Sequence, residues 1–318
     1  MAEGSVADVS DDAKAEPARA TAPIAGALFA ANIGVFVAQV ILSGNWRYAL
    51  GMPEPILRWL GANASLWTIA DNRFETLVTS CFLHGSVLHL GLNMFVLWQV
   101  GPLLERAIGS ARFFTLYLGA GIVGSAASAI WGRFFGQTLS VGASGALCGL
   151  LAAAMIVGIR TEGWKSELAI GMARWLGLIF LVGLIRAFRK DIAQIDNAAH
   201  VGGALGGVIV ALTWQRGVTY SRRAEQAIIA ACVGVILASG AVIYVRNRTD
   251  PYLFLDHEGR MKAALDAYHN GRCDHARAAM SRAVQMDPHN RTIRELGEEI
   301  ARECSDPASP TPVPHIRR

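Results

Sequence analysis

Stretches free of Asp, Glu, Lys and Arg alternate along this chain with short segments that contain them. A helix needs about 20 apolar residues to cross the hydrocarbon core of a bilayer, and the charge-free windows have that scale. They run over Thr21–Asn45, Thr76–Leu104, Phe113–Gly132, Phe134–Ile159, Asn197–Gln215 and Gln226–Val245. A further span is expected near Leu168–Ile185, with the Arg174 guanidinium extending toward the headgroups. The pattern predicts an all-α, polytopic membrane helix bundle with seven spans.

The polar segments differ in character. A long connection, Trp46–Glu75, follows the first span and carries three tryptophans among prolines and glycines, which is typical of a loop in the membrane interface. After the last span, small residues precede a glycine turn, a second alanine-led segment and a proline: Ala263, Ala264, Ala267, Gly271, Ala276, Met280, Ala283 and Pro288. This pattern resembles one tetratricopeptide unit, and a generic helical hairpin explains it equally well.

These features divide the chain into five parts. The predicted parts are a disordered N-terminal tail (1–20), a six-span core (21–216), one additional transmembrane helix (217–246), a small soluble helical extension (247–304) and a disordered tail (305–318). The acidic start lacks the basic region and early apolar core of a secretory signal, so the tail is expected to remain uncleaved.

Composition supports a membrane protein and excludes other classes. Hydrophobic residues make up 53% of the 318 residues and charged ones only 17%, below the roughly 25% typical of soluble domains. The net charge of +4 is too small and too dispersed to indicate a nucleic-acid partner. The five cysteines show no spacing suited to a metal. We therefore expect no metal and no cofactor.

Polar side chains inside a membrane span are costly, and they mark candidate functional sites. The second span contains His84, His89 and Asn93. His89 and Asn93 lie four positions apart and therefore share one helix face. A single such residue is more simply explained as interhelical hydrogen-bonding, but three in one span favour a site.

Two further spans contain the groups that hydrolytic chemistry needs. The fourth holds Ser144 between Gly142 and Gly145 in G-A-S-G, where the helix is expected to begin. A helix start offers free N–H groups to a developing oxyanion, although a serine there is also an ordinary helix cap. The sixth span holds His200, followed by glycines, among them Gly203 and Gly207, that allow close helix approach.

The three sets of residues are expected to meet. The second, fourth and sixth spans run in the same direction, and each carries its polar groups near its N-terminal end, so all lie in one half of the membrane. A serine hydroxyl needs a base, and histidine is suited to that role near neutral pH. No carboxylate lies within the spans to orient the histidine. The sequence therefore predicts a Ser–His dyad.

These motifs resemble the rhomboid family of intramembrane serine proteases. His84, His89 and Asn93 match its H-x4-H-x3-N, residues 142–145 match its G-x-S-G, and His200, Gly203 and Gly207 match its A-H-x-x-G-x-x-x-G. A fourth fragment, Glu105, Arg106 and Gly109, is similar to an acidic-basic-glycine signature of the family. The resemblance covers about Arg73 to Trp214. It departs at Arg73–Phe74, where many members have Trp–Arg.

The resemblance implies a six-helix rhomboid core and a role for each matched residue. Ser144 would be the nucleophile and His200 its general base. His89, Asn93 and the backbone N–H of Ser144 would form the oxyanion hole. His84, Gly142, Gly145, Gly203 and Gly207 would support the site. The substrates would be transmembrane segments of single-pass proteins.

Two other functions are alternatives to a protease. A catalytically silent rhomboid-like scaffold would bind membrane helices without cutting them, but such proteins usually lack the serine or the histidine. A transporter with a Ser/His proton relay should show inverted repeats and broken-helix carboxylates, which the sequence lacks. The expected partners are transmembrane substrates, the lipid bilayer and a protein that binds the C-terminal hairpin.

The predicted orientation in the membrane depends on the distribution of Lys and Arg and on the number of spans. A slight excess of Lys and Arg favours a cytoplasmic N-terminus, and the resemblance implies an active site toward the outer face of a bacterial inner membrane. Seven spans would then place the C-terminal extension outside. An oxidising location would allow Cys273 and Cys304 to form a disulfide, the alternative being two separate thiols.

Overall fold

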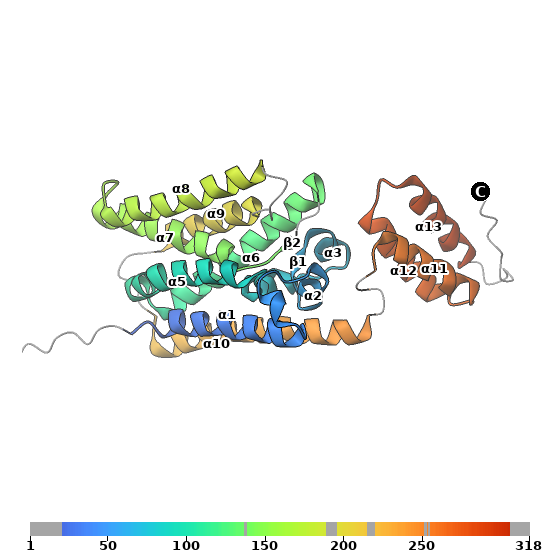
Figure 1. Ribbon diagram of the computed structural model, residues 1–318, viewed down its shortest axis with the longest axis horizontal. Coiled ribbons are helices and arrows are strands. Elements are labelled where there is room, and N and C mark those ends of the chain that lie inside the picture. The colour runs from blue at the N-terminus through green and yellow to red at the C-terminus, as the bar shows by residue number, and fades with distance from the viewer. Residues whose placement is uncertain are drawn as a thin grey trace, which may run out of the picture.

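The computed structural model describes residues 21–136, 139–188, 196–214, 220–250, 253 and 255–305. The predicted terminal tails lie outside these ranges, except for residue 305. Within these ranges helices dominate, and six long apolar helices and a shorter one, α9, form a bundle (Figure 1). They are α1 (Pro23–Leu42), α5 (Val87–Ile108), α6 (Ser110–Phe135), α7 (Ser144–Glu162), α8 (Glu167–Ala187), α9 (Asn197–Thr213) and α10 (Arg222–Thr249).

The predicted all-α polytopic bundle is confirmed. Within the described residues, six helices are long and apolar enough to cross a membrane, and they include α8, which contains Arg174. The seventh, α9, has only 17 residues, the lower limit for a span of ordinary bilayer thickness. Two charge-free windows nevertheless begin before the long helices that they contain.

The second span starts later than predicted. Thr76–Leu104 was expected to be one helix, but α4 (Thr76–Thr79) and the 3-10 helix η2 (Ser80–Phe82) end in extended backbone at Leu83. α5 begins only at Val87, where the Ser86 side chain accepts a hydrogen bond from the backbone N–H of His89. This serine N-cap sets the helix start. His84 therefore lies in the preceding loop, outside the span.

The fourth charge-free window begins before the helix that it contains, whereas the predicted helix start at Ser144 is confirmed. α6 continues to Phe135 and ends at Gly136, whose φ of +117° favours glycine. The short strand β2 (Leu139–Ser140) follows, and α7 begins at Ser144. The window that began at Phe134 thus joins the end of one helix, a loop and the next helix.

The long connection after α1 is ordered. It contains the 3-10 helix η1 (Trp46–Ala49), α2 (Glu54–Trp59), the strand β1 (Asn63–Ala64) and α3 (Ser65–Ala70). β1 pairs antiparallel with β2 in the register Asn63 opposite Ser140 and Ala64 opposite Leu139. The connection is thereby joined to the segment that leads into α7.

Helix α7 lies at the centre of the bundle. Its alanines and leucines are almost fully buried, and it packs against α5, α6, α8 and α9. α9 comes close enough for Gly203 to contact the backbone of Gly145, and Gly207 that of Gly149. A Cβ atom at Gly203 or Gly207 would overlap the facing carbonyl, so these positions require glycine. The small-residue face predicted for this span is therefore an α7–α9 interface.

The C-terminal extension is a compact helical unit. It consists of α11 (His257–His269), α12 (Cys273–Met286) and α13 (Arg291–Glu303), with Gly271 at φ +70° between the first two. The predicted small residues Ala264, Ala267, Ala276 and Ala283 are buried in its core with Met280, whereas Ala263 is only partly buried. Cys273 and Cys304 form a disulfide. The hairpin is present, and its identity as a tetratricopeptide unit stays a prediction.

Candidate active site

Ser144 is the first residue of α7. Gly142, two positions earlier, has φ +117°, and its N–H donates to the carbonyl of Ser80 at 2.9 Å. This turn directs the chain into the helix and leaves Ser144 among the unpaired N–H groups of the first turn. The Ser144 side chain does not cap its own helix: Ala143 is the N-cap residue and forms no side-chain cap hydrogen bond.

His200 meets Ser144 across the α7–α9 interface. Its Nε2 lies 2.9 Å from the Ser144 Oγ, and its side chain is 6% exposed. The Asp196 carboxylate caps α9 by accepting from the N–H of Ala199. The contact of Gly203 with Gly145 sets the separation of the two helices. Glycine packing thus determines the Ser–His distance.

The second ring nitrogen of His200 has no hydrogen-bond partner among the described residues. A triad would place a carboxylate there to orient the imidazole. Within the described part of the chain, Ser144 and His200 are paired by a hydrogen bond, and no carboxylate bonds the second nitrogen of the imidazole.

His89 and Asn93 lie beside the Ser144 turn. A Cβ atom at Gly142 would lie 2.7 Å from the His89 ring and 3.4 Å from the Asn93 Nδ2. The Nδ2 of Asn93 is buried and makes no hydrogen bond to any described residue. A buried amide donor without a partner is costly, so its presence favours a polar ligand such as a substrate oxygen.

His84 supports this arrangement from the loop before α5. Its ring is fully buried and lies edge-on to the His89 ring, with centroids 5.2 Å apart. Gln39 of α1 holds the His84 backbone at both ends: its amide N–H donates to the carbonyl at 3.1 Å, and its oxygen accepts from the N–H at 3.0 Å. His84 therefore packs behind His89.

Gln39 was not predicted, and neither was Asn63, whose side-chain N–H donates to the Ser125 carbonyl at 2.7 Å. A signal existed for Gln39, since it is a polar residue inside a charge-free window. Glu105 was noticed only as part of a motif. Its carboxylate accepts from the N–H groups of Ile24 and Ala25 and so caps the start of α1.

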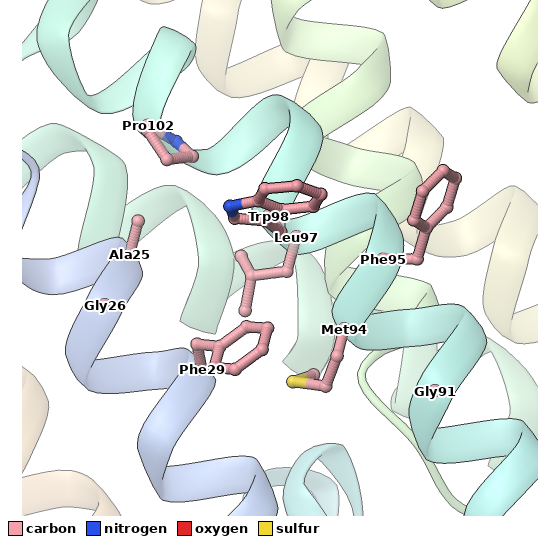
Figure 2. A pocket seen from close by; sticks show the side chains of 9 residues that line it. All are labelled: Ala25, Gly26, Phe29, Gly91, Met94, Phe95, Leu97, Trp98 and Pro102. Atoms are coloured by element: carbon pink, nitrogen blue, oxygen red, sulfur yellow. The ribbon is translucent and has the colours of Figure 1, made fainter.

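An apolar groove lies between α1 and α5, apart from these residues. It has a volume of about 490 Å³ and is lined by Ala25, Gly26, Phe29, Gly91, Met94, Phe95, Leu97, Trp98 and Pro102 (Figure 2). Neither Ser144 nor His200 contributes to it. Its lining suits hydrocarbon and offers no hydrolytic group.

Residues 71–216 match the family model of the Rhomboid domain. The matched segment is a little under half of the chain and is similar to a rhomboid domain. It contains all of the predicted site residues, and it coincides closely with the Arg73–Trp214 segment in which the motifs occur. This similarity and the apolar helices support an integral membrane protein.

Curated relatives are similar to about half of this chain. The Rhomboid protease GluP of Bacillus subtilis is 33% identical over 178 residues, 55% of this chain and 32% of that protein. RHOMBOID-like protein 6, mitochondrial, of Arabidopsis thaliana is 35% identical over 160 residues, 50% of this chain and 49% of that protein. The Presenilin-associated rhomboid-like protein A, mitochondrial, of Danio rerio is 29% identical over 182 residues, 55% of this chain and 45% of that protein. The matched part of the chain thus spans about a third to about a half of the length of these relatives.

Proposed function

We propose that this protein is an intramembrane serine endopeptidase that cleaves transmembrane segments of single-pass membrane proteins. The observation that carries the proposal is the 2.9 Å contact between the Ser144 Oγ and the His200 Nε2 inside the helix bundle. A nucleophile and a base within hydrogen-bond reach are the signature of covalent catalysis. The rhomboid domain and the relative named as a protease support the same activity.

The chemistry has two steps. The Ser144 Oγ attacks the scissile carbonyl while His200 takes its proton, and His200 then returns that proton to the leaving amine. Water, deprotonated by His200, releases the acyl group from Ser144 in the second step. Asn93, His89 and the N–H of Ser144 stabilise the oxyanion in both steps. One such donor is worth about 10²–10³ in kcat in other hydrolases.

A scaffold that binds membrane helices without cutting them is the alternative function. It would not need a serine hydroxyl held against an imidazole, or an unpaired amide donor beside it. These two features favour the protease. The preferred substrate is a helix that unwinds easily, because its scissile carbonyl must give up a helix hydrogen bond before Ser144 can attack it.

We further propose an orientation. Ser144 and His200 lie near the N-terminal ends of α7 and α9, and Asn93 near that of α5, so the dyad belongs to one membrane face. With a cytoplasmic N-terminus, that face is the outer one. The bacterial relative fits a bacterial inner membrane, although other relatives are named as mitochondrial.

The activity test uses the full chain, co-expressed with tagged single-pass proteins that carry small, helix-destabilising residues. Cleavage by the wild type and none by Ser144→Ala is the expected result. Ser239→Ala is the matched control, because Ser239 lies on α10 and its hydroxyl donates to the Val235 carbonyl of the same helix. Undiminished cleavage by Ser144→Ala, or no cleavage of any candidate together with no labelling by a fluorophosphonate, would overturn the proposal.

A further inference from the structure

The C-terminal extension is joined to the bundle by a buried ion pair. Arg260 of α11 donates from both terminal nitrogens to the Asp71 carboxylate, at 2.5 and 2.7 Å, and from Nε to the Leu255 carbonyl at 2.9 Å. The two side chains are 0% and 1% exposed. A two-pronged arginine–carboxylate contact fixes orientation as well as distance. The docking of α11 on this part of the bundle is therefore geometrically specific.

Asp71 ends helix α3, which directly follows β1. Its backbone carbonyl accepts from Arg246 of α10 at 3.0 Å, so both C-terminal elements converge on it. Within the same segment, the Thr68 hydroxyl donates to the Asn63 Oδ1 at 2.8 Å. Asn63 in turn is anchored to the Ser125 carbonyl of α6. The position of β1 is thus set by α6 on one side and, through α3, by the ion pair on the other.

A second contact joins the extension to the same strands. Met286 of α12 is buried in a cluster with Ala64, Leu66, Trp67 and Ala70, and Leu139 of β2 packs against that cluster. Leu139 pairs with Ala64 and lies shortly before the Gly142–Ser144 turn. In Figure 1 the extension lies at the end of the bundle that holds β1, β2 and α3. The extension therefore shares an apolar cluster with β1 and α3, and the strand that leads to the nucleophile packs against that cluster.

We propose that the extension is part of the framework of the active site, and that Arg260 is a positioning residue for Ser144. Through Asp71, Arg260 holds α3 and β1, and β1 holds β2 and the turn that presents Ser144. This inference rests on the proposed protease function. It assigns the extension a role in the reaction, in addition to any protein that it binds.

The test compares Arg260→Ala and Arg260→Lys with wild type in the full chain, reconstituted in lipid vesicles. Lys262→Ala is the matched control, since Lys262 lies on the same helix and is exposed. Three quantities are measured: the rate of Ser144 labelling by a fluorophosphonate, kcat and KM on one cleaved substrate, and amide exchange in residues 139–145. Labelling and exchange do not depend on substrate binding.

Arg260→Ala is expected to lower kcat and the labelling rate about tenfold, because small misplacements of a reacting group are costly. KM should stay unchanged, and exchange in 139–145 should become faster. Arg260→Lys should recover part of the loss, and Lys262→Ala should match wild type. The double substitution Asp71→Arg with Arg260→Asp should restore activity relative to either single change.

Wild-type values of kcat, labelling and exchange in Arg260→Ala would overturn the inference, and so would a rise in activity, which would make the extension inhibitory. If Arg260→Ala does not accumulate as folded protein, Arg260→Lys decides the question through the same three measurements. Wild type that neither cleaves nor labels would refute the protease function instead. The exchange measurement needs no activity and would still test the coupling of Arg260 to β2.

Discussion

Ser144 and His200 form a unit with one shared hydrogen bond, and mutations in such a unit do not add. We expect Ser144→Ala and His200→Ala each to abolish cleavage, and the double variant to be no worse than either single one. The check is kcat/KM for the three variants on one substrate. A double variant at least tenfold below both singles would mean that the two residues act separately.

Asn93 offers a way to separate catalysis from folding. Its Nδ2 has no partner among the described residues, so removing it breaks no hydrogen bond to them. Asn93→Ala should lower kcat by about 10²–10³ as one oxyanion donor is lost, with little change in thermal stability. Kinetics and thermal unfolding of the same preparation test this. A lower melting temperature with an unchanged kcat would instead show that Asn93 acts in packing.

The site residues that lie near helix starts could be predicted from the sequence, whereas the one in a loop could not. Ser144, His89, Asn93 and His200 are found together because three parallel helices bring their N-terminal ends to one level. His84 was placed within the second span on charge alone. Hydropathy does not register the Ser86 cap that delays the helix, so it could not show that His84 lies in a loop and contacts Gln39.

At the scale of elements, the α7–α9 contact leaves the least room for a larger side chain. Gly203→Ala would place a methyl group against the Gly145 backbone, and α9 would have to move away. We expect cleavage to fall at least tenfold and thermal stability to decrease. Gly177→Ala on α8 is the control, because nothing lies within 4 Å of its Cβ position.

The outcome is measured as cleavage rate and melting temperature of both variants. In the control, alanine should leave activity unchanged and slightly stabilise the helix, since glycine costs up to about 1 kcal/mol in a helix interior. If both variants had the same cleavage rate and melting temperature, the site would tolerate a movement of α9 away from α7.

Most helices were predictable because membrane spans are defined by the absence of charge. The β1–β2 pairing was not, since two residues per strand carry no periodicity to detect. The connection Trp46–Glu75 was expected to lie in the membrane interface, which stays a prediction, and the short helices and β1 within it were not foreseen. Its order depends on contacts with residues far along the chain, such as Asp71 with Arg260.

At the scale of the whole molecule, topology is open to direct test. α10 ends beside the α2–α3 connection, where Arg246 donates to Asp71 and Asn247 to Trp59. The extension thus lies on the same side as the dyad, and we expect that side to be outside the cell. An alkaline phosphatase fused after Arg318 should be active, and a reporter that needs the cytoplasm should be silent. The opposite pattern would invert the proposed orientation.

The disulfide gives an independent check on that location, since disulfides persist in oxidising compartments. Cys273–Cys304 joins the start of α12 to the end of α13. On non-reducing gels, Cys273→Ser should migrate more slowly than wild type. Cys232→Ser should not, because Cys232 is a free thiol in α10. Identical mobility of all three proteins would show that the thiols are unpaired in the cell.

The contact between Asp71 and Arg260 also fixes an order of events during synthesis. The two residues are separated by 189 positions, which corresponds to roughly 10 to 40 s of translation at about 5–20 residues per second. The helices that carry Ser144 and His200 are synthesised within that interval, before Arg260 is available to pair with Asp71. The extension that pairs with Asp71 is therefore synthesised after both of these helices. A chain that stalls or is clipped before Arg260 would hold every residue of the dyad and yet lack the contact that completes its support.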